Sequence, residues 1–166
     1  MIWAGSGTPF LNETGIRNAL TAAATEPTGN RVLTQTVDGA FTEVDRDRAV
    51  RMPYIFAKLK MTQRERNRLR DELRQGRVRI AAITLYDNLD QDGDAVLVTA
   101  AGFSQKITIT HQDITFFIPV VFGSTVRITA VQDGGGGNVT VGIRTAFGPV
   151  SLAPLAPGQS IDIPVL

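Results

Sequence analysis

The sequence predicts a mainly β protein: an antiparallel β-sandwich of jelly-roll type, with one short α-helix and an extended, irregular N-terminal arm. Three observations lead to this fold class. Apolar and polar residues alternate with a period of two through residues 78–166, turn-forming residues divide that region into short runs, and a single capped helical pattern precedes it. The chain is therefore expected to comprise an arm (1–60), a basic helix (61–77) and one β-domain (78–166).

The arm is expected because Gly, Thr, Asn and Pro interrupt every short apolar stretch of residues 1–60. Inside it, one or two helical turns are expected at residues 18–25, and short extended pieces at residues 31–37 and 41–44. Its apolar residues, Trp3 and Phe10 among them, are too numerous for a solvated tail. Two alternatives follow: the arm wraps its own domain, or it buries these residues on another subunit. Trp3 and Phe10 are therefore candidate partner-binding residues.

One helix is expected from Thr62 to Gln75. Thr62 and Glu65 fit the capping-box pattern, in which each side chain accepts a hydrogen bond from the other residue's backbone amide. Gly76 stands where helices commonly end in the left-handed conformation. Leu69 and Leu73, four residues apart, would form its narrow apolar stripe.

The β-domain is expected to contain short strands separated by turns. In one run, for example, Val126 and Ile128 alternate with Arg127 and Thr129. The runs are 78–86, 95–101, 105–110, 114–122, 125–132, 138–146 and 160–165. The proline-rich segment 148–158 is expected to cross between sheets or to follow an edge. The expected large core residues are Phe103, Phe116, Phe122 and Phe147.

Composition excludes several classes of protein. The absence of cysteine excludes a disulfide framework, a thiolate metal site and a cysteine nucleophile. The first residues lack the pattern of a secretory signal, and no apolar run approaches the ~20 residues that span a bilayer. We therefore expect a soluble protein made in the cytoplasm, with no membrane partner.

The acidic loop formed by Asp87, Asp90, Asp92 and Asp94 offers the oxygen ligands that calcium prefers. The EF-hand register fails, however, because neither Asp87 nor Asp90 is followed by a glutamate at the twelfth position. A hairpin loop with an Asp-Gly turn explains the same residues. No metal ligand is predicted here, and the alternative of cation binding stays open.

No catalytic residue or cofactor site is predicted, and the protein is expected not to be an enzyme. His111 and Asp113 lack a serine in a nucleophile-elbow context. The tetraglycine at residues 134–137 is not followed by the Gly-Lys-Ser/Thr of a phosphate loop, and a flexible hairpin tip is expected there.

The clearest functional signal is the distribution of charge. Residues 46–79 contain twelve basic and four acidic residues, a net charge of +8, whereas residues 1–45 and 80–166 carry −3 and −4. On the expected helix, Arg66, Arg70 and Arg74 repeat every four residues and so lie on one face. The residues expected to bind a partner are Arg64, Arg66, Arg70, Arg74 and Arg77.

Three kinds of partner are considered: a protein surface, nucleic acid and carbohydrate. An acidic surface of a neighbouring subunit suits arginine, which pairs bidentately with carboxylates. Nucleic acid is the alternative, through phosphate contacts that carry no sequence information. A carbohydrate-binding sandwich comes third, because Trp3, Tyr54 and Tyr86 are dispersed along the chain.

The organisation of the whole chain resembles that of small structural proteins of tailed bacteriophage virions, such as head-decoration (cement) or neck and tail proteins. The resemblance rests on the apolar arm (1–60), one charged helix (62–75), and a cysteine-free β-domain rich in Thr, Val and Gly that ends at residues 160–166. It implies a virion protein whose partners are copies of itself or a larger protein shell. It carries over no functional residue.

Overall fold

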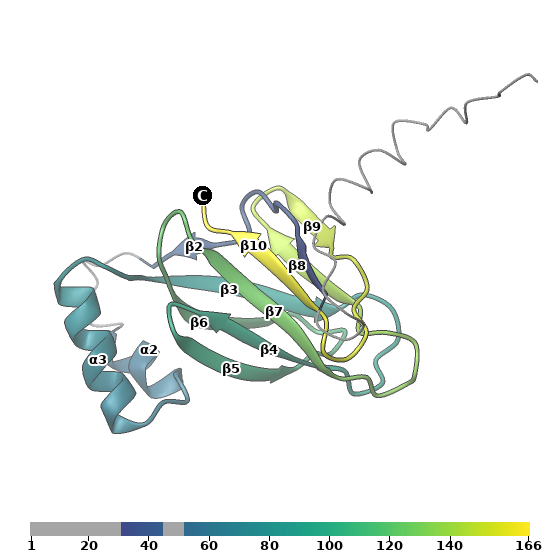
Figure 1. The fold of residues 1–166 in the computed structure, drawn as a ribbon, viewed down its shortest axis with the longest axis horizontal. Coiled ribbons are helices and arrows are strands. Elements are labelled where there is room, and N and C mark those ends of the chain that lie inside the picture. Colours follow the sequence, from purple (N-terminus) through teal and green to yellow (C-terminus); the bar gives the residue numbers. More distant parts are fainter. Residues whose placement is uncertain (1–30, 45–51) are drawn as a thin grey trace, which may run out of the picture.

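The computed structural model describes residues 31–44 and 52–166 (Figure 1). Trp3, Phe10 and the helical turns expected at residues 18–25 lie outside these residues. The described part is mainly β, with ten strands in two five-stranded sheets and two helices. The extended pieces expected near residues 31–37 and 41–44 are confirmed as two short strands, β1 (Val32–Thr34) and β2 (Thr42–Glu43).

The first sheet has the strand order β1-β10-β7-β4-β5. Strand β1 runs parallel to β10, and every other neighbouring pair is antiparallel. The remaining bounds are β4 (Ala95–Ala100), β5 (Phe103–Thr108), β7 (Thr125–Gln132) and β10 (Ser160–Pro164). The arm residues in β1 thus complete an edge of this sheet.

The second sheet is built around β3 (Arg79–Asp87). Strand β6 (Ile114–Val120) pairs with residues 79–85 along one edge of β3. Because β6 occupies that edge, β2 and β8 (Val141–Thr145) both pair with the opposite edge of β3. Strand β2 pairs with residues 81–82 and β8 with residues 84–87. Strand β9 (Gly148–Ser151) then pairs with β8, and all these pairs are antiparallel.

One hydrophobic core contains residues of both sheets. It takes alternate residues of strands from both, such as Ile83 and Ile143 from the second sheet and Val96 and Ile128 from the first, each at most 1% exposed. The period of two that predicts the strands is therefore the pattern of residues that face this core. Phe116 belongs to it, as expected.

The prediction that Phe122 and Phe147 belong to the core is wrong. Phe122 is 50% exposed and Phe147 is 83% exposed. Both lie in the turns that follow β6 and precede β9, where the chain reverses and leaves the core. Phe103 is buried as expected, but it packs in a second cluster beneath the helices.

The structure corrects the expectation of a single helix and of an arm that stays irregular up to residue 60. A first helix, α2, spans Met52–Lys58, and a second, α3, spans Gln63–Arg74. Helix α2 buries Ile55 and Phe56, and Pro53 suits its first turn, where a missing N–H costs nothing. Neither helix of residues 52–166 is long and apolar enough to cross a membrane.

The capping box that predicts the second helix is confirmed. Thr62 is the N-cap, its side chain accepts from the Glu65 amide, and the Glu65 carboxylate accepts from the Thr62 amide. Gly76 follows the helix with a φ of 69°, in the left-handed region.

The C-terminal part follows the expected route with one shorter strand. The run expected at 138–146 forms a strand only from Val141, because Val139 pairs instead with Leu155 in an isolated bridge. The proline-rich segment 148–158 both follows an edge, as β9, and carries the chain across to β10 in the other sheet.

Candidate partner-binding surface on the basic helix

Helix α3 is anchored to the β-strands by one apolar face. Leu69 is 0% exposed and lies in a cluster with Ile80 of β3 and Phe103 of β5, while Leu73 packs at its margin. This cluster is separate from the core that the two sheets share, and α2 contributes Phe56 to it. Burial of one face fixes the rotation of α3 and directs the rest of its surface to solvent.

The expected arginine row, Arg66, Arg70 and Arg74, lies along this helix and has few acidic partners. Arg66 Nε donates to the Met61 carbonyl at 3.4 Å, and the Arg70 guanidinium lies 5.1 Å from the centre of the Phe56 ring. Arg74 has a carboxylate neighbour, Asp71, at 3.8 Å, in a pair whose side chains are 79% and 63% exposed. Such an exposed, long ion pair contributes little, so the row keeps its positive charge available.

The other two arginines expected to bind a partner, Arg64 and Arg77, differ in their surroundings. Arg64 is exposed in the first turn of α3. Arg77 instead pairs with Glu72 through two hydrogen bonds of 2.7 and 3.1 Å. The hydrogen bond to Arg77 lowers the pKa of Glu72, and the bond to Glu72 raises the pKa of Arg77. Arg77 is thus already neutralised within the chain.

Two further arginines of the basic segment have structural contacts that the sequence analysis did not assign. Arg68 donates to the Gly102 carbonyl at 3.0 Å and lies 4.3 Å from the centre of the Phe103 ring, which ties α3 to the turn between β4 and β5. Arg79 pairs with Glu43 at 2.9 Å and so links β3 to β2. Local charge density in the sequence cannot distinguish these two arginines from the arginine row, because their partners lie far away in the chain.

A second surface exposes large apolar side chains at one end of the sheets, where the C-terminus lies near the turn that precedes β7 and the turn between β8 and β9 (Figure 1). Phe122, Phe147 and Leu166 are 50%, 83% and 77% exposed. Phe147 packs against Gly39, where an added Cβ would lie 3.1 Å from its ring. Gly39 and Leu166 line the same small pocket, of about 100 Å³. We call Phe122, Phe147 and Leu166 the apolar end.

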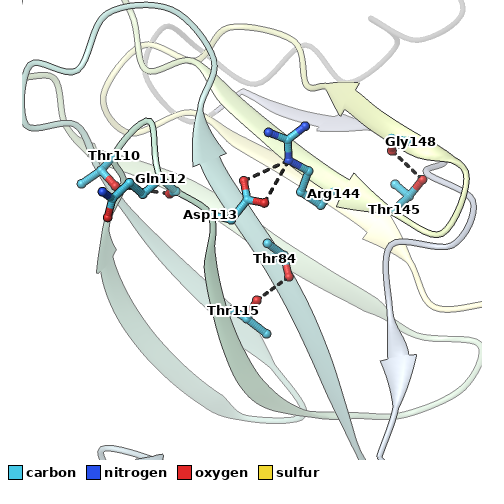
Figure 2. Close-up of polar contacts among 8 residues, drawn as sticks. All are labelled: Thr84, Thr110, Gln112, Asp113, Thr115, Arg144, Thr145 and Gly148. Carbon is cyan, nitrogen blue, oxygen red and sulfur yellow. Dashed lines mark hydrogen bonds and ion pairs between the residues drawn. The ribbon is translucent and has the colours of Figure 1, made fainter.

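The histidine and aspartate considered for catalysis have separate partners. The His111 ring contacts the Leu89 carbonyl at 2.7 Å. Asp113 accepts from Arg144 Nε at 2.9 and 3.1 Å, beside the 2.7 Å hydroxyl contact of Thr84 with Thr115 (Figure 2). These contacts hold β6 and β8 to β3, so Asp113 has a structural partner other than the histidine.

Of the aromatic residues considered for sugar binding, Tyr54 and Tyr86 lie on different elements, and Trp3 is outside the described residues. Tyr54 of α2 packs edge-on against Phe117. Tyr86 of β3 stacks with Arg144, and its ring lies over Gly142, where a Cβ would overlap it. Each ring is thus engaged with its own neighbour.

Comparison of the chain with protein-family models, with curated proteins and with solved structures gave no match. The two surfaces described above and the charge of the chain are therefore the features that indicate its function.

Proposed function

We propose that this protein is a non-enzymatic structural protein that assembles with copies of itself or with a larger protein shell. The organisation of the chain suggests a virion as the setting, in a head-decoration, neck or tail position. We also infer that the two sheets form a sandwich of jelly-roll type, a scaffold that leaves its helices and loop ends available for contacts.

The observation that carries the proposal is the arginine row of Arg66, Arg70 and Arg74. Like charges at i, i+4 spacing are mildly unfavourable in an isolated helix. Among the described residues, the one ion pair that this row forms, between Arg74 and Asp71, is long and exposed. An acidic surface on a neighbouring subunit would offset this repulsion, and residues 80–166 of the chain itself carry a net charge of −4.

The apolar end supports assembly independently of charge. Large exposed apolar side chains that gather on one surface are typical of protein contact sites. Aromatic residues in particular contribute strongly to the centre of an interface once water is excluded. The apolar end contains two of them, Phe122 and Phe147.

Electrostatic binding of nucleic acid is the second candidate function. The same arginine row favours it, because exposed guanidinium groups on a helix can contact successive phosphates. Self-assembly and nucleic-acid binding differ in how they should depend on salt concentration. Added salt would steeply lower the affinity for nucleic acid, whereas contacts between subunits at the apolar end would persist.

The proposal is tested by the solution mass of the full chain, measured by light scattering at low and at high salt. A mass of two or more subunits at low salt is expected. A monomer at every salt and protein concentration would contradict self-assembly. In that case, the anisotropy of a labelled oligonucleotide, titrated with the protein over a range of salt, would test the second candidate.

A further inference from the structure

Three carboxylates come together where the β3–β4 and β7–β8 connections meet. Asp87 ends β3, Asp94 directly precedes β4, and Asp92 lies in the loop between them. One carboxylate oxygen from each lies within 4.8 Å of the other two. We propose that Asp87, Asp92 and Asp94 form a binding site for a divalent cation of the calcium type.

The first support is a buried oxygen that has no partner. Asp87 is 3% exposed. Its Oδ1 accepts from the Leu89 amide at 3.1 Å and from the Thr140 hydroxyl at 3.2 Å. Its Oδ2 is buried and accepts no hydrogen bond from the described residues. A buried carboxylate oxygen is costly unless it is paired or coordinates a metal, so this atom points to a ligand.

The second support is uncompensated charge. Asp94 is 1% exposed, and its two oxygens accept from the backbone amides of Gly134 and Thr140 at 3.0 and 3.4 Å. None of the ion pairs formed within residues 31–44 and 52–166 includes a carboxylate of this cluster. A bound cation would supply the missing positive charge.

The ligand set favours calcium over magnesium. Calcium takes six to eight oxygen ligands in a flexible arrangement, whereas magnesium usually binds one or two carboxylates and keeps several waters. The oxygens of the three carboxylates lie within 4.8 Å of one another, close enough to share one coordination shell. Beside them is a cavity of about 50 Å³, lined by Asp90, Asp92, Asp94 and Thr140 among others. It has room for a water molecule, which calcium accepts beside protein oxygens.

The tetraglycine makes this arrangement sterically possible. A Cβ at Gly134 would overlap the Asp92 carbonyl, and a Cβ at Gly135 would overlap the Asp92 carboxylate. The acidic loop therefore lies directly against glycine backbone. Because Asp87 ends β3 of one sheet and Asp94 leads into β4 of the other, a cation held here would tie together two strand ends that belong to different sheets.

The test is calcium titration of the chelator-treated full chain, followed by calorimetry and by the thermal unfolding midpoint. Calcium chloride should release or absorb heat and raise the midpoint, with magnesium chloride less effective. Asp92→Asn removes one negative charge from the ligand set at an exposed position, so the variant should fold and bind calcium about tenfold more weakly, since loss of even a second-shell partner costs about 10–100-fold. Asp38→Asn, which removes an exposed carboxylate in the β1–β2 loop, is the matched control and should bind as the wild type does.

Three results would overturn the proposal. The first is no heat and no shift of the midpoint with calcium in the wild type. The second is an equal response in Asp92→Asn, which would mean that calcium binds elsewhere. The third is stronger binding of magnesium than of calcium, which would contradict the assignment to calcium.

Discussion

The backbone amide of Thr62 donates a hydrogen bond to the Glu65 carboxylate at 2.8 Å, and the Glu65 amide donates to the Thr62 hydroxyl at 3.3 Å. This reciprocal pair closes the first turn of α3, the helix that carries the arginine row. The hydrogen bond from the Thr62 backbone lowers the pKa of Glu65, so the carboxylate that closes the cap is ionised at neutral pH.

The first prediction concerns this cap. Thr62→Ala removes the hydroxyl that accepts from the Glu65 amide, and it should lower the free energy of unfolding by about 1 kcal/mol. Denaturant unfolding followed by circular dichroism measures the change. Thr62→Ser keeps the hydroxyl and should remain within a few tenths of the wild type. Equal stability of the alanine and serine variants would show that the cap contributes nothing.

The second prediction concerns the burial of Leu69, which anchors α3. Leu69→Ala should cost about 2–5 kcal/mol, because Leu69 is fully buried and its truncation leaves a cavity. Leu73→Ala should cost less, since Leu73 is only partly buried. The same unfolding measurement compares them. A cost for Leu69→Ala no greater than that for Leu73→Ala would mean that α3 is not held as described.

The third prediction tests the contact between the acidic loop and the tetraglycine. Gly134→Ala should destabilise the protein by about 1–3 kcal/mol, because its Cβ would overlap the Asp92 backbone carbonyl. Gly137→Ala is the matched control, since no atom lies within 4 Å of the position of its Cβ. Thermal unfolding of the two variants should therefore differ. If both behave alike, the loops do not approach each other as the structure has them.

The fourth prediction is a pH dependence that arises from Asp133. Its Oδ1 accepts from the amides of Gly135, Gly136 and Gly137, and Oδ2 accepts from the amide of Asn138. These bonds, the one from Gly136 foremost, lower the pKa of Asp133 from its ordinary value of 3.8. A carboxylate with a lowered pKa in the folded state stabilises the protein above the ordinary value, and this contribution is lost as the pH falls through the lowered one.

The measurement for Asp133 is the difference in unfolding midpoint between the wild type and Asp133→Asn as a function of pH. The wild type should be the more stable at neutral pH, and its advantage should shrink below about pH 4 as the carboxylate takes up a proton. The other carboxyl groups titrate in both proteins, so they largely cancel in the difference. An advantage that does not change with pH would rule out this role for the Asp133 charge.

The sequence is sufficient to predict an element when the residues that determine it are neighbours in the chain. Helix α3 could be predicted because Thr62, Glu65 and Gly76 define both of its ends. Helix α2 was missed because its seven residues give barely two turns of periodicity and Pro53 interrupts the pattern. Phe122 and Phe147 were placed in the core by their size, but their exposure depends on where the turns fall.

Contacts between distant segments could not be predicted. The tetraglycine was expected to be a flexible hairpin tip, whereas its amides bind the Asp133 carboxylate and its backbone supports Asp92. Asp92 and Gly134 are separated by some forty residues, and only the pairing of β4 with β7 brings their loops together. Likewise, the sequence placed Arg77 with the exposed arginines because its pairing with Glu72 depends on how the chain leaves α3.

Assembly through the arginine row is tested by the solution mass of a variant that lacks the row. Arg66→Gln/Arg70→Gln/Arg74→Gln removes three positive charges from α3. Lys106→Gln/Thr108→Glu/Gln112→Glu changes the net charge equally at exposed positions on and beside the edge strand β5 and is the control. By light scattering at low salt, we predict an oligomer for the wild type and the control, and a lower mass for the arginine variant, because its helix no longer attracts an acidic surface. A wild type that is already monomeric, or a control that dissociates as fully as the arginine variant, would contradict assembly through this surface.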